Sequence, residues 1–407
     1  MTEIILGVLS FTSIVLLLAT FVLGARRFLV PSGQCELRIN QRLTCTASVG
    51  QRLLDVLNQE GIHLPSACGG AGTCGLCKAW VSEGGGEPTP QEIALLPRAE
   101  TNAGARLACQ VPVLGPMTVK VDENYFGINV WNCTVESVRH VSTLISEIVL
   151  RLPQGELIDF DSGGFVEVTC PPYKFNFADL KVESEYQDVW SKSGLHSLKA
   201  GTTKPVTRAY SMANRPGEND VIRLNIRVAV PPPGKWNIPP GVVSSWLFSL
   251  QPGDQVEASG PYGYFMVEDS KREVIFIGGG VGMAPLYSQI LDLLLTRKSD
   301  RKISYWYGAR SKRELYYHEE FEQLEKQHDN FGWHVVLSDP QPKDNWDGPT
   351  GFVHTAIYEG YLSSHNAPED CEYYLCGPPL MVKAVLSMLD DLGVDLESIH
   401  YDDFGGG

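Results

Sequence analysis

Four cysteines stand at a spacing that suits a metal centre. Cys68, Cys74 and Cys77 form the pattern C-x5-C-x2-C within CGGAGTCGLC, and Cys109 follows after 31 further residues. Four thiolates can surround two irons bridged by sulfides, and the intervening glycines let the backbone wrap tightly and aim N–H groups at the sulfurs. A structural zinc site is the alternative, but zinc ribbons usually carry two C-x2-C pairs, whereas Cys74 and Cys77 form one. The spacing predicts a 2Fe–2S cluster held by these four cysteines.

A second set of chemically useful residues lies in RAYSMAN, which begins at Arg208. Arg208 can neutralise a pyrophosphate, Tyr210 can stack on a flavin ring, and the Ser211 hydroxyl can hydrogen-bond the flavin N5 atom. Taken alone, the segment is typical of an ordinary strand end.

The sequence GVVSS, from Gly241, is typical of a helix start whose free N–H groups can hold a phosphate. In the alternative interpretation, Ser244 or Ser245 caps the helix with its own hydroxyl and no ligand is involved.

A glycine-rich loop follows an apolar run typical of a buried parallel strand, Glu273 to Ile277. The loop, Gly278 to Gly282, leads through Met283 into a helical stretch that is expected to reach Leu295. Strand, glycine loop and helix in this order can hold a pyrophosphate, although the glycines are not in the G-x-G-x-x-G register. A plain turn between a strand and a helix is the alternative.

Two more predicted strands end in residues that suit a nucleotide site. The strand from Lys302 to Tyr307 runs into Gly308 and Arg310, and the strand from Glu372 to Leu375 runs into Cys376-Gly377-Pro378. Ligands of open parallel sheets bind at the carboxyl ends of the strands, so Cys376 is expected beside the nicotinamide, unless it is simply a buried thiol. Near the C-terminus, Phe404 can cover the flavin face, or it belongs to a disordered tail.

Composition and charge exclude several classes of function. The chain has 407 residues, 43% of them hydrophobic, which predicts two to four globular domains. The net charge of -15 argues against nucleic-acid binding and suits either a basic protein partner or plain solubility. Ten cysteines are too few for a disulfide scaffold of this length.

The N-terminal region is expected to anchor the chain in a membrane. No charged residue occurs from Ile4 to Gly24, and these 21 residues would form a helix about 30 Å long. A cleaved signal peptide would have a basic start and a shorter apolar core. Arg26 and Arg27 follow the run, so the positive-inside rule places the rest of the chain in the cytoplasm. No second apolar run of this length occurs, so this chain cannot form a transmembrane ion path by itself.

Periodicity and turn residues predict a multidomain fold in four parts. These are a single transmembrane helix in residues 1–27, a small α+β domain around the cysteines in 33–127, an antiparallel β-barrel in 130–269 and an α/β domain with a parallel sheet in 270–407. A polar stretch, residues 173–205, interrupts the barrel as an insertion to which the sequence assigns no role.

The motifs in residues 130–404 resemble those of the ferredoxin–NADP reductase superfamily in order and spacing. The strings PSACGGAGTCGLC, RAYSMAN, GGGVGMAP, YYLCGPPLM and YDDFGG are more closely similar to those of the F subunits of bacterial Na+-translocating NADH:quinone oxidoreductases. That family has an N-terminal anchor, a 2Fe–2S ferredoxin domain of the β-grasp type, an FAD domain and an NADH domain.

The resemblance implies the activity of a Na+-transporting NADH:ubiquinone reductase in the bacterial inner membrane. NADH reduces FAD by hydride transfer, single electrons pass to the 2Fe–2S cluster, and flavin-carrying partner subunits take them toward ubiquinone. It implies Ser211, Cys376 and Phe404 as catalytic residues. The implied contacts of FAD and NADH are Arg208, Tyr210, Ser211, Arg227, Gly241, Val242, Val243, Ser244, Gly279, Gly280, Val281, Gly282, Met283, Gly308, Arg310, Cys376, Gly377, Pro378 and Phe404.

Two questions remain open from the residues. Arg310, Lys312 and Arg313 form a basic cluster that can accept the 2′-phosphate of NADPH, whereas the resemblance implies NADH. The activity also has rivals: a reductase component of a multicomponent oxygenase, or a membrane-tethered redox sensor without catalysis. The predicted anchor argues against the first, and the intact Arg208, Tyr210 and Ser211 argue against the second.

Overall fold

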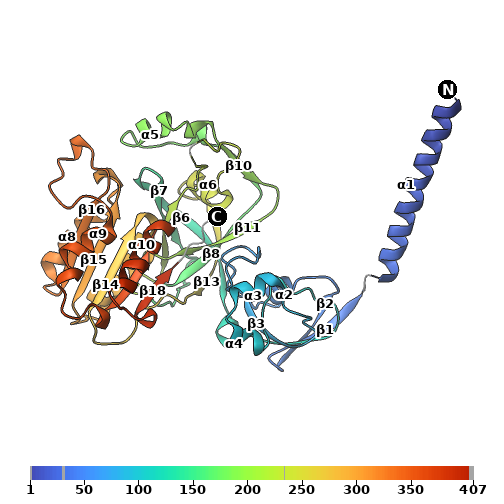
Figure 1. Ribbon diagram of the computed structural model, residues 1–407, viewed down its shortest axis with the longest axis horizontal. Helices are drawn as coiled ribbons and strands as arrows, with labels where there is room; N and C mark the ends of the chain where they lie inside the picture. Colours follow the sequence, from blue (N-terminus) through green and yellow to red (C-terminus); the bar gives the residue numbers. More distant parts are fainter. Residues whose placement is uncertain (1, 30–32, 233, 403–407) are drawn as a thin grey trace. The chain divides into compact units, whose positions relative to one another are not determined.

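The computed structural model describes residues 2–29, 33–232 and 234–402; within the first range it describes the side chains of residues 6–21 and 24. The chain divides into two units, Met1–Ile128 and Asn129–Gly407 (Figure 1). Each unit has its own hydrophobic core. Phe404 and the rest of the predicted tail, residues 403–407, lie outside the described residues.

Helix α1, Thr2–Leu29, opens the first unit. Large apolar side chains along it, such as Leu6, Phe11 and Leu17, are more than half exposed. Within the described part of the chain, no helix combines the length and the apolar character needed to cross a membrane. The expectation of a span from Ile4 to Gly24 is therefore not confirmed.

The remainder of the first unit is a five-stranded mixed sheet with three short helices. The strand order is β2-β1-β5-β3-β4, with β1 parallel to β5 and the other pairs antiparallel. The strands are β1 Gln34–Ile39, β2 Leu43–Ser48, β3 Lys78–Glu83, β4 Ala105–Leu107 and β5 Met117–Lys120, and the helices are α2 Leu53–Gln59, α3 Pro90–Leu95 and α4 Arg98–Asn102.

Alternation along β1 explains how this sheet forms its core. Leu37 and Ile39 are fully buried, while Arg38 between them is exposed. On α2 the apolar stripe predicted from the sequence is buried against the sheet core, at Leu53, Leu54, Val56 and Leu57. The small α+β module is therefore confirmed.

A six-stranded antiparallel sheet begins the second unit. Its order is β11-β8-β13-β6-β7-β12, and a bridge between Met212 and Leu224 joins its two edge strands and closes it into a barrel. The strands are β6 Asn129–Ser142, β7 Ile145–Arg151, β8 Phe165–Cys170, β11 Val206–Ser211, β12 Val221–Arg227 and β13 Gln255–Tyr262. Helix α6, Val242–Ser249, packs into the barrel core through Val243, Trp246 and Leu247.

The insertion in residues 173–205 folds as a hairpin with a helix between its strands. Strands β9, Tyr173–Asn176, and β10, Lys199–Thr202, form an antiparallel pair, and α5, Gln187–Lys192, lies between them in sequence (Figure 1). Trp190 of α5 is fully buried and belongs to the barrel core. The insertion is thus an integral part of the barrel's packing.

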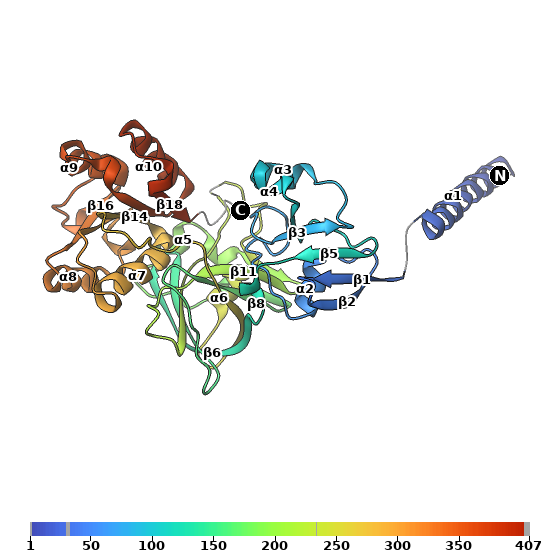
Figure 2. The same ribbon diagram turned by 90° about the horizontal axis from the view of Figure 1, so that it is seen from below.

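A five-stranded parallel sheet, ordered β16-β15-β14-β17-β18, completes the second unit. Helices α7 and α8 cover one face and α9 and α10 the other (Figure 2). All six residues of β14 are buried, as expected of a strand covered on both faces. The elements are β14 Val274–Gly279, β15 Ile303–Ala309, β16 Phe331–Leu337, β17 Glu372–Cys376, β18 Ile399–Asp402, α7 Met283–Leu291, α8 His318–Gln327, α9 Val353–Gly360 and α10 Pro379–Asp391.

The structure corrects one boundary in this sheet domain. The helix that follows the glycine loop was expected to reach Leu295, but α7 ends at Leu291 and a π-helical turn, Asp292–Thr296, follows. The multidomain α/β class itself is confirmed.

Candidate functional site

The four predicted cluster ligands converge in the first unit. The Sγ atoms of Cys68 and Cys74 lie 3.4 Å apart, and the Cys77 and Cys109 thiols are within hydrogen-bonding range of each other. Cys77 and Cys109 are almost fully buried, while Cys68 and Cys74 are partly exposed. All four sulfurs therefore face a common region at the end of β4 and the loop before β3.

Hydrogen bonding within each cysteine pair favours one thiolate and one thiol, because it lowers the pKa of Cys68 and Cys109 and raises the pKa of Cys74 and Cys77. Donation from the Cys74 thiol lowers the pKa of Cys68 to about 3, and backbone N–H groups of Thr73 and Cys74 act in the same direction. Donation from Cys77 lowers the pKa of Cys109 to about 7, with help from the Gln110 amide, whose Nε2 lies 3.4 Å from the Cys109 sulfur. Because thiolate is the form that ligates metals, this set of four sulfurs with N–H donors fits a 2Fe–2S cluster.

The loop needs glycine where the backbone passes close to Gln110. Gly72 has φ +78°, and a Cβ there would lie 2.4 Å from the Gln110 Nε2 atom. Arg52 fixes the neighbouring part of the loop, because its Nη1 donates to the Gly70 carbonyl at 3.1 Å. A side chain at Gly72 would therefore displace the amide that donates to Cys109.

The predicted flavin residues Arg208, Tyr210 and Ser211 lie on β11, which pairs with β8. Strand alternation places Arg208 and Tyr210 on one face and Ser211 on the other. Arg208 is exposed, Tyr210 is partly buried, and burial raises the pKa of its hydroxyl. An exposed guanidinium beside a half-buried aromatic ring fits a dinucleotide that contains a flavin.

Helix α6 begins without a side-chain cap. Gly241 is its N-cap residue and has no side chain that could accept a bond from the first turn. The Ser244 hydroxyl instead accepts from the Ala229 N–H at 3.2 Å and lies 3.4 Å from the Gly241 carbonyl. The capping role considered for Ser244 is therefore wrong, and an uncapped helix start is the geometry that a phosphate can use.

Three glycine-bearing strand ends meet at one edge of the parallel sheet. Strand β14 ends at Gly279 and β17 ends at Cys376, while Gly308 is the next-to-last residue of β15. Close approach requires glycine at Gly282, where a Cβ would lie 2.1 Å from the Cys376 carbonyl oxygen. The pyrophosphate-type loop thus packs directly on the turn that carries Gly377 and Pro378.

A cavity of about 970 Å³ opens at this edge of the sheet. Of the predicted contacts, those that line it are Arg227, Gly279, Gly280, Gly308, Arg310 and Pro378. Val281, Gly282, Met283, Cys376 and Gly377 lie behind its lining, in the glycine loop or at the end of β17, and Cys376 is fully buried. The β11 residues and the start of α6 do not contribute to it within the described chain. The volume suits a nucleotide.

Two tyrosines that the sequence analysis did not single out hold the glycine loop in place. The hydroxyls of Tyr307 and Tyr316 both donate to the Gly280 carbonyl, at 3.1 and 2.9 Å. Burial raises the pKa of each tyrosine, so both remain protonated donors. The Gly280–Val281 peptide is therefore fixed, and its N–H points opposite to the tyrosines.

Asp402 is a third residue that sequence reasoning missed. Its carboxylate accepts from the Ser211 hydroxyl at 3.2 Å and from the Tyr264 hydroxyl at 3.1 Å. It reaches Ser211 because β18 pairs with β17 in parallel, with Cys376 opposite Asp402. No local signal in the sequence marks this contact.

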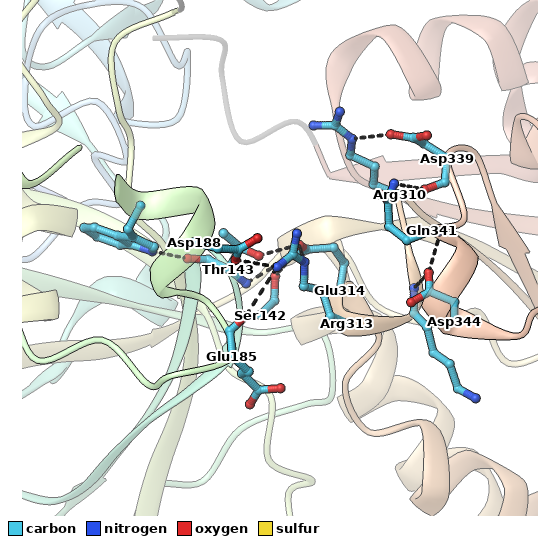
Figure 3. A network of polar contacts seen from close by, with 12 residues as sticks. Ser142, Thr143, Glu185, Asp188, Arg310, Arg313, Glu314, Asp339, Gln341 and Asp344 are labelled. Carbon is cyan, nitrogen blue, oxygen red and sulfur yellow. Dashed lines mark hydrogen bonds and ion pairs between the residues drawn. The ribbon is translucent and has the colours of Figure 1, made fainter. Parts of the chain in front are cut away.

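The predicted basic cluster is engaged in ion pairs. Arg310 Nε lies 3.2 Å from Asp339, and Arg313 Nη1 donates to Asp188 of the insertion at 2.8 Å (Figure 3). The Arg313 guanidinium lowers the pKa of Asp188. Two of the three cations therefore already face carboxylates.

One further group of potential metal ligands lies outside these sites. Atoms of Glu273, His365 and Cys371 come within 4.8 Å of one another. However, the Lys302 ammonium lies 3.5 Å from the Glu273 carboxylate, and the backbone N–H of Ala367 donates to the His365 Nδ1 atom, which leaves the proton on Nε2. This arrangement favours ion pairing over cation binding.

Three family models match the chain in the order of its elements. They are the 2Fe-2S iron-sulfur cluster binding domain at residues 37–114, the oxidoreductase FAD-binding domain at 177–267 and the oxidoreductase NAD-binding domain at 276–387. The first covers all four cysteines, and the last covers the glycine loop. The chain thus combines a 2Fe–2S, an FAD-binding and an NAD-binding domain.

Solved structures with a similar fold include two reductases. A cytochrome P450 reductase, GcoB, from Amycolatopsis has a TM-score of 0.62 at 26% identity, covering 91% of this chain and 98% of that one. A ferredoxin reductase in carbazole 1,9a-dioxygenase has a TM-score of 0.60 at 25% identity, covering 92% and 99%.

Curated relatives are similar over nearly their whole lengths. The F subunit of the Na(+)-translocating NADH-quinone reductase of Marinomonas sp. (strain MWYL1) is 50% identical over 404 residues, 99% of both chains. The protein of the same name from Methylococcus capsulatus is 50% identical over 407 residues, 100% of both. With this identity over this coverage, and with the three domains in order, the chain belongs to the family of Na+-translocating NADH-quinone reductase F subunits.

Proposed function

We propose that this chain is the electron-entry subunit of a Na+-pumping NADH:quinone oxidoreductase. It oxidises NADH in its second unit and delivers single electrons through its first unit to partner subunits, toward ubiquinone. The observation that carries the proposal is the presence, in one chain, of four convergent cysteine sulfurs and a nucleotide-sized cavity at the carboxyl ends of a parallel sheet. Relatives at 50% identity that are F subunits of the Na(+)-translocating NADH-quinone reductase support the same role here.

Bound FAD supplies the exchange between two-electron nicotinamide chemistry and the one-electron chemistry of a 2Fe–2S cluster. Arg208 and the uncapped start of α6 hold the FAD pyrophosphate, and Tyr210 packs on its ring system. Ser211 orients the reacting edge of the ring, and Asp402 fixes the Ser211 hydroxyl.

The glycine loop after β14 and the strand ends beside it hold NADH. The Gly280–Val281 peptide, fixed by two tyrosine hydroxyls, presents an N–H to the pyrophosphate. Pro378 forms part of the wall on the nicotinamide side, and the turn that carries it begins at Cys376, which is fully buried. Phe404, proposed to cover the flavin face, lies outside the described residues.

The coenzyme is NADH rather than NADPH. Arg310 pairs through Nε with Asp339 and Arg313 pairs with Asp188, so a carboxylate already balances the charge of each guanidinium. Asp339 would also repel a 2′-phosphate, while a carboxylate in this position can accept from ribose hydroxyls.

Residues 4–24 anchor the chain in the bacterial inner membrane, with both units on the cytoplasmic side. The support is the run of 21 residues without charge and the exposure of large apolar side chains such as Phe11 and Phe21 along α1. The proposed anchor comprises residues 4–24 as a whole. The described part of α1 alone does not have the length and hydropathy that a membrane span needs.

A reductase component of an oxygenase system is the second candidate, because two of the solved structures with this fold are reductases of that kind. These two reductases are 26% and 25% identical to the chain, about half the identity of the F subunits. The F subunits also match over 99% or more of both lengths, which includes the N-terminal segment, so they support the first proposal more strongly.

The full chain, loaded with FAD and cluster, tests the proposal in two stages. Under anaerobic conditions, NADH should bleach the flavin absorbance, and ferricyanide should restore it. Failure to bleach would refute the enzymatic role. In membrane vesicles, NADH-driven quinone reduction should require this chain and respond to Na+. Flavin reduction without any dependence of quinone reduction on the chain would favour the oxygenase reductase.

A further inference from the structure

The insertion in residues 173–205 forms part of the wall of the nucleotide cavity. Asp188, Val189, Lys192 and Ser193 of this segment line the cavity, together with residues 308–311 that follow β15. The barrel's insertion and the parallel sheet thus enclose the same space. No role for this segment is evident from the sequence or from the chemistry of the proposed reaction.

Arg313 fastens the insertion to the parallel-sheet domain. Its guanidinium donates to the Asp188 carboxylate at 2.8 Å and to the Glu185 carbonyl at 3.3 Å (Figure 3). The Arg313 side chain is 18% exposed and the Asp188 side chain 45%, so the guanidinium is partly shielded from solvent while the carboxylate is not. Trp190 anchors the other side of α5, because its Nε1 donates to the Thr143 carbonyl at 2.7 Å.

Glu314, the next residue, holds a second segment of the barrel. Its carboxylate accepts from the Thr143 N–H at 3.1 Å and from the hydroxyls of Ser142 and Thr143. These residues form the turn between β6 and β7, which also lines the cavity. Arg313 and Glu314, two adjacent residues of opposite charge, therefore bind the insertion and the β6–β7 turn, respectively, to the same loop (Figure 3).

Arg313 and Glu314 belong to the loop that follows β15, next to the predicted site of the adenosine half of NADH. Arg310 lines the cavity three residues before Arg313, and Lys312 N–H donates to Asp344 at 3.1 Å, which ties the loop to the region after β16. In the sheet, β15 lies on one side of β14 and β17 on the other. With the nicotinamide on the β17 side and the pyrophosphate at the β14 loop, the adenosine falls on the β15 side.

We propose that Arg313 and Glu314 are positioning residues for nucleotide binding, which hold the insertion as a wall over the adenosine half of NADH. The inference rests on the proposed function and deepens it. Arg313 and Glu314 line the cavity on its β15 side, away from the reacting atoms, and their partners Asp188 and Thr143 line it as well, so the two contacts set the shape of that wall. The effect is expected on affinity for the dinucleotide and not on hydride transfer.

Steady-state kinetics of the full FAD-loaded chain with ferricyanide test this inference. In Arg313→Ala, KM for NADH should rise roughly three- to tenfold while kcat changes by less than about twofold. With reduced nicotinamide mononucleotide, which lacks the adenosine half, kcat/KM should stay at the value of the unmodified chain. The charge swap Asp188→Arg with Arg313→Asp should recover part of the lost affinity for NADH.

The matched control is Arg151→Ala, which removes an arginine that pairs with Glu136 and Asp220 on the same barrel without lining the cavity. An unchanged KM for NADH in Arg313→Ala would overturn the inference. An equal loss of kcat/KM with NADH and with the mononucleotide would also overturn the inference, as would loss of bound flavin. Either result would place the effect of the substitution outside the wall over the adenosine half. If Arg313→Ala does not fold, Asp188→Asn provides the same comparison at preserved side-chain size. An unmodified chain whose flavin NADH cannot reduce would instead refute the proposed function.

Discussion

Each sulfur of the four-cysteine site has a different environment, and this makes single substitutions informative. Cys74 is partly exposed and lies 3.4 Å from Cys68, while Cys77 and Cys109 are buried. Removal of Cys74 takes away one ligand without opening a cavity in the core of the first unit.

We expect Cys74→Ala to abolish the EPR signal of the reduced 2Fe–2S cluster while NADH still reduces the flavin. The flavin and nucleotide residues belong to the second unit, which has its own core and does not depend on this sulfur. Cys35→Ala is the control, because Cys35 belongs to the same unit but lies on β1, outside the cluster loop. Survival of the cluster signal in Cys74→Ala would show that the ligand assignment is wrong.

The contact between Asp402 and Ser211 makes a second prediction at the residue level. Asp402→Asn keeps the size of the side chain but replaces one accepting oxygen with a donor, so the Ser211 hydroxyl loses its fixed orientation. We expect kcat for NADH oxidation to fall on the order of tenfold, with KM changed much less.

Asp395→Asn is a suitable control for this effect, because Asp395 is an exposed carboxylate in the same C-terminal stretch. Rapid-reaction measurement of flavin reduction would locate the change in the hydride step. A rise in KM without a change in kcat would mean that Asp402 shapes the nucleotide site and does not act through Ser211.

The residues that the sequence identified and those it missed differ in how locally they are encoded. Cys68, Cys74 and Cys77 lie within ten positions, so their spacing is visible in one short segment. Asp402 meets Ser211 across 191 positions, and Arg313 meets Asp188 across 125. Arg313 was interpreted as a phosphate anchor because its partner is contributed by an insertion whose fold no local pattern reveals.

Secondary-structure elements show the same dependence on context. The run that forms β14 was predicted because a strand buried on both faces is uniformly apolar. Strand β16 was missed, since Gly332 and His334 interrupt its apolar residues at the sheet edge, and β18 has four residues. Both are placed by pairing with β15 and β17 and not by their own composition.

Helix α3 and strand β4 are joined by a buried ion pair that supports the cluster. Glu92 is fully buried and accepts from Arg106 Nε at 2.9 Å and from Arg106 Nη2 at 3.0 Å. It also accepts from the Thr89 and Leu107 N–H groups, at 2.8 and 2.9 Å. Leu107 lies two residues before Cys109, so Glu92 fixes the strand that leads to this proposed cluster ligand.

This pairing predicts acid sensitivity in the first unit. Burial alone would raise the pKa of Glu92, but the hydrogen bonds from Arg106 and the two N–H groups outweigh it and lower the pKa. Because the folded pKa lies below the unfolded one, the stabilisation is complete above the unfolded value, near 4.5, and is lost as pH falls through the folded pKa.

We expect Glu92→Gln to destabilise the first unit by about 3 kcal/mol at neutral pH, because Arg106 is left buried without its counter-charge. The difference from the unmodified chain should shrink as pH falls below about 4.5. Chemical denaturation monitored by far-ultraviolet circular dichroism measures this, because the bridging sulfides of the cluster are themselves lost in acid. Glu87→Gln, an exposed carboxylate in the preceding loop, is the control, and a Glu92→Gln effect independent of pH would contradict the assigned ion pair.

At the scale of the whole molecule, the chain combines two independently packed units with one N-terminal helix. The core of the first unit is formed by residues from Leu37 to Val121, and none of its members belongs to α1. The second unit has separate cores in the barrel and on both faces of the parallel sheet. Electron entry can therefore be separated experimentally from attachment to a membrane.

Deletion of residues 2–29 should leave flavin reduction by NADH and the EPR signal of the cluster unchanged, because no core residue is lost. The shortened chain should appear in the supernatant after centrifugation of lysed cells, and quinone reduction by the membranes should fall. Leu17→Arg is the milder variant, since a charge at the centre of a spanning helix costs about 3 kcal/mol of insertion free energy. Thr2→Arg, at the helix start, is its control. Retention of both variants on the membrane would show that partner subunits, and not residues 4–24, hold the chain there.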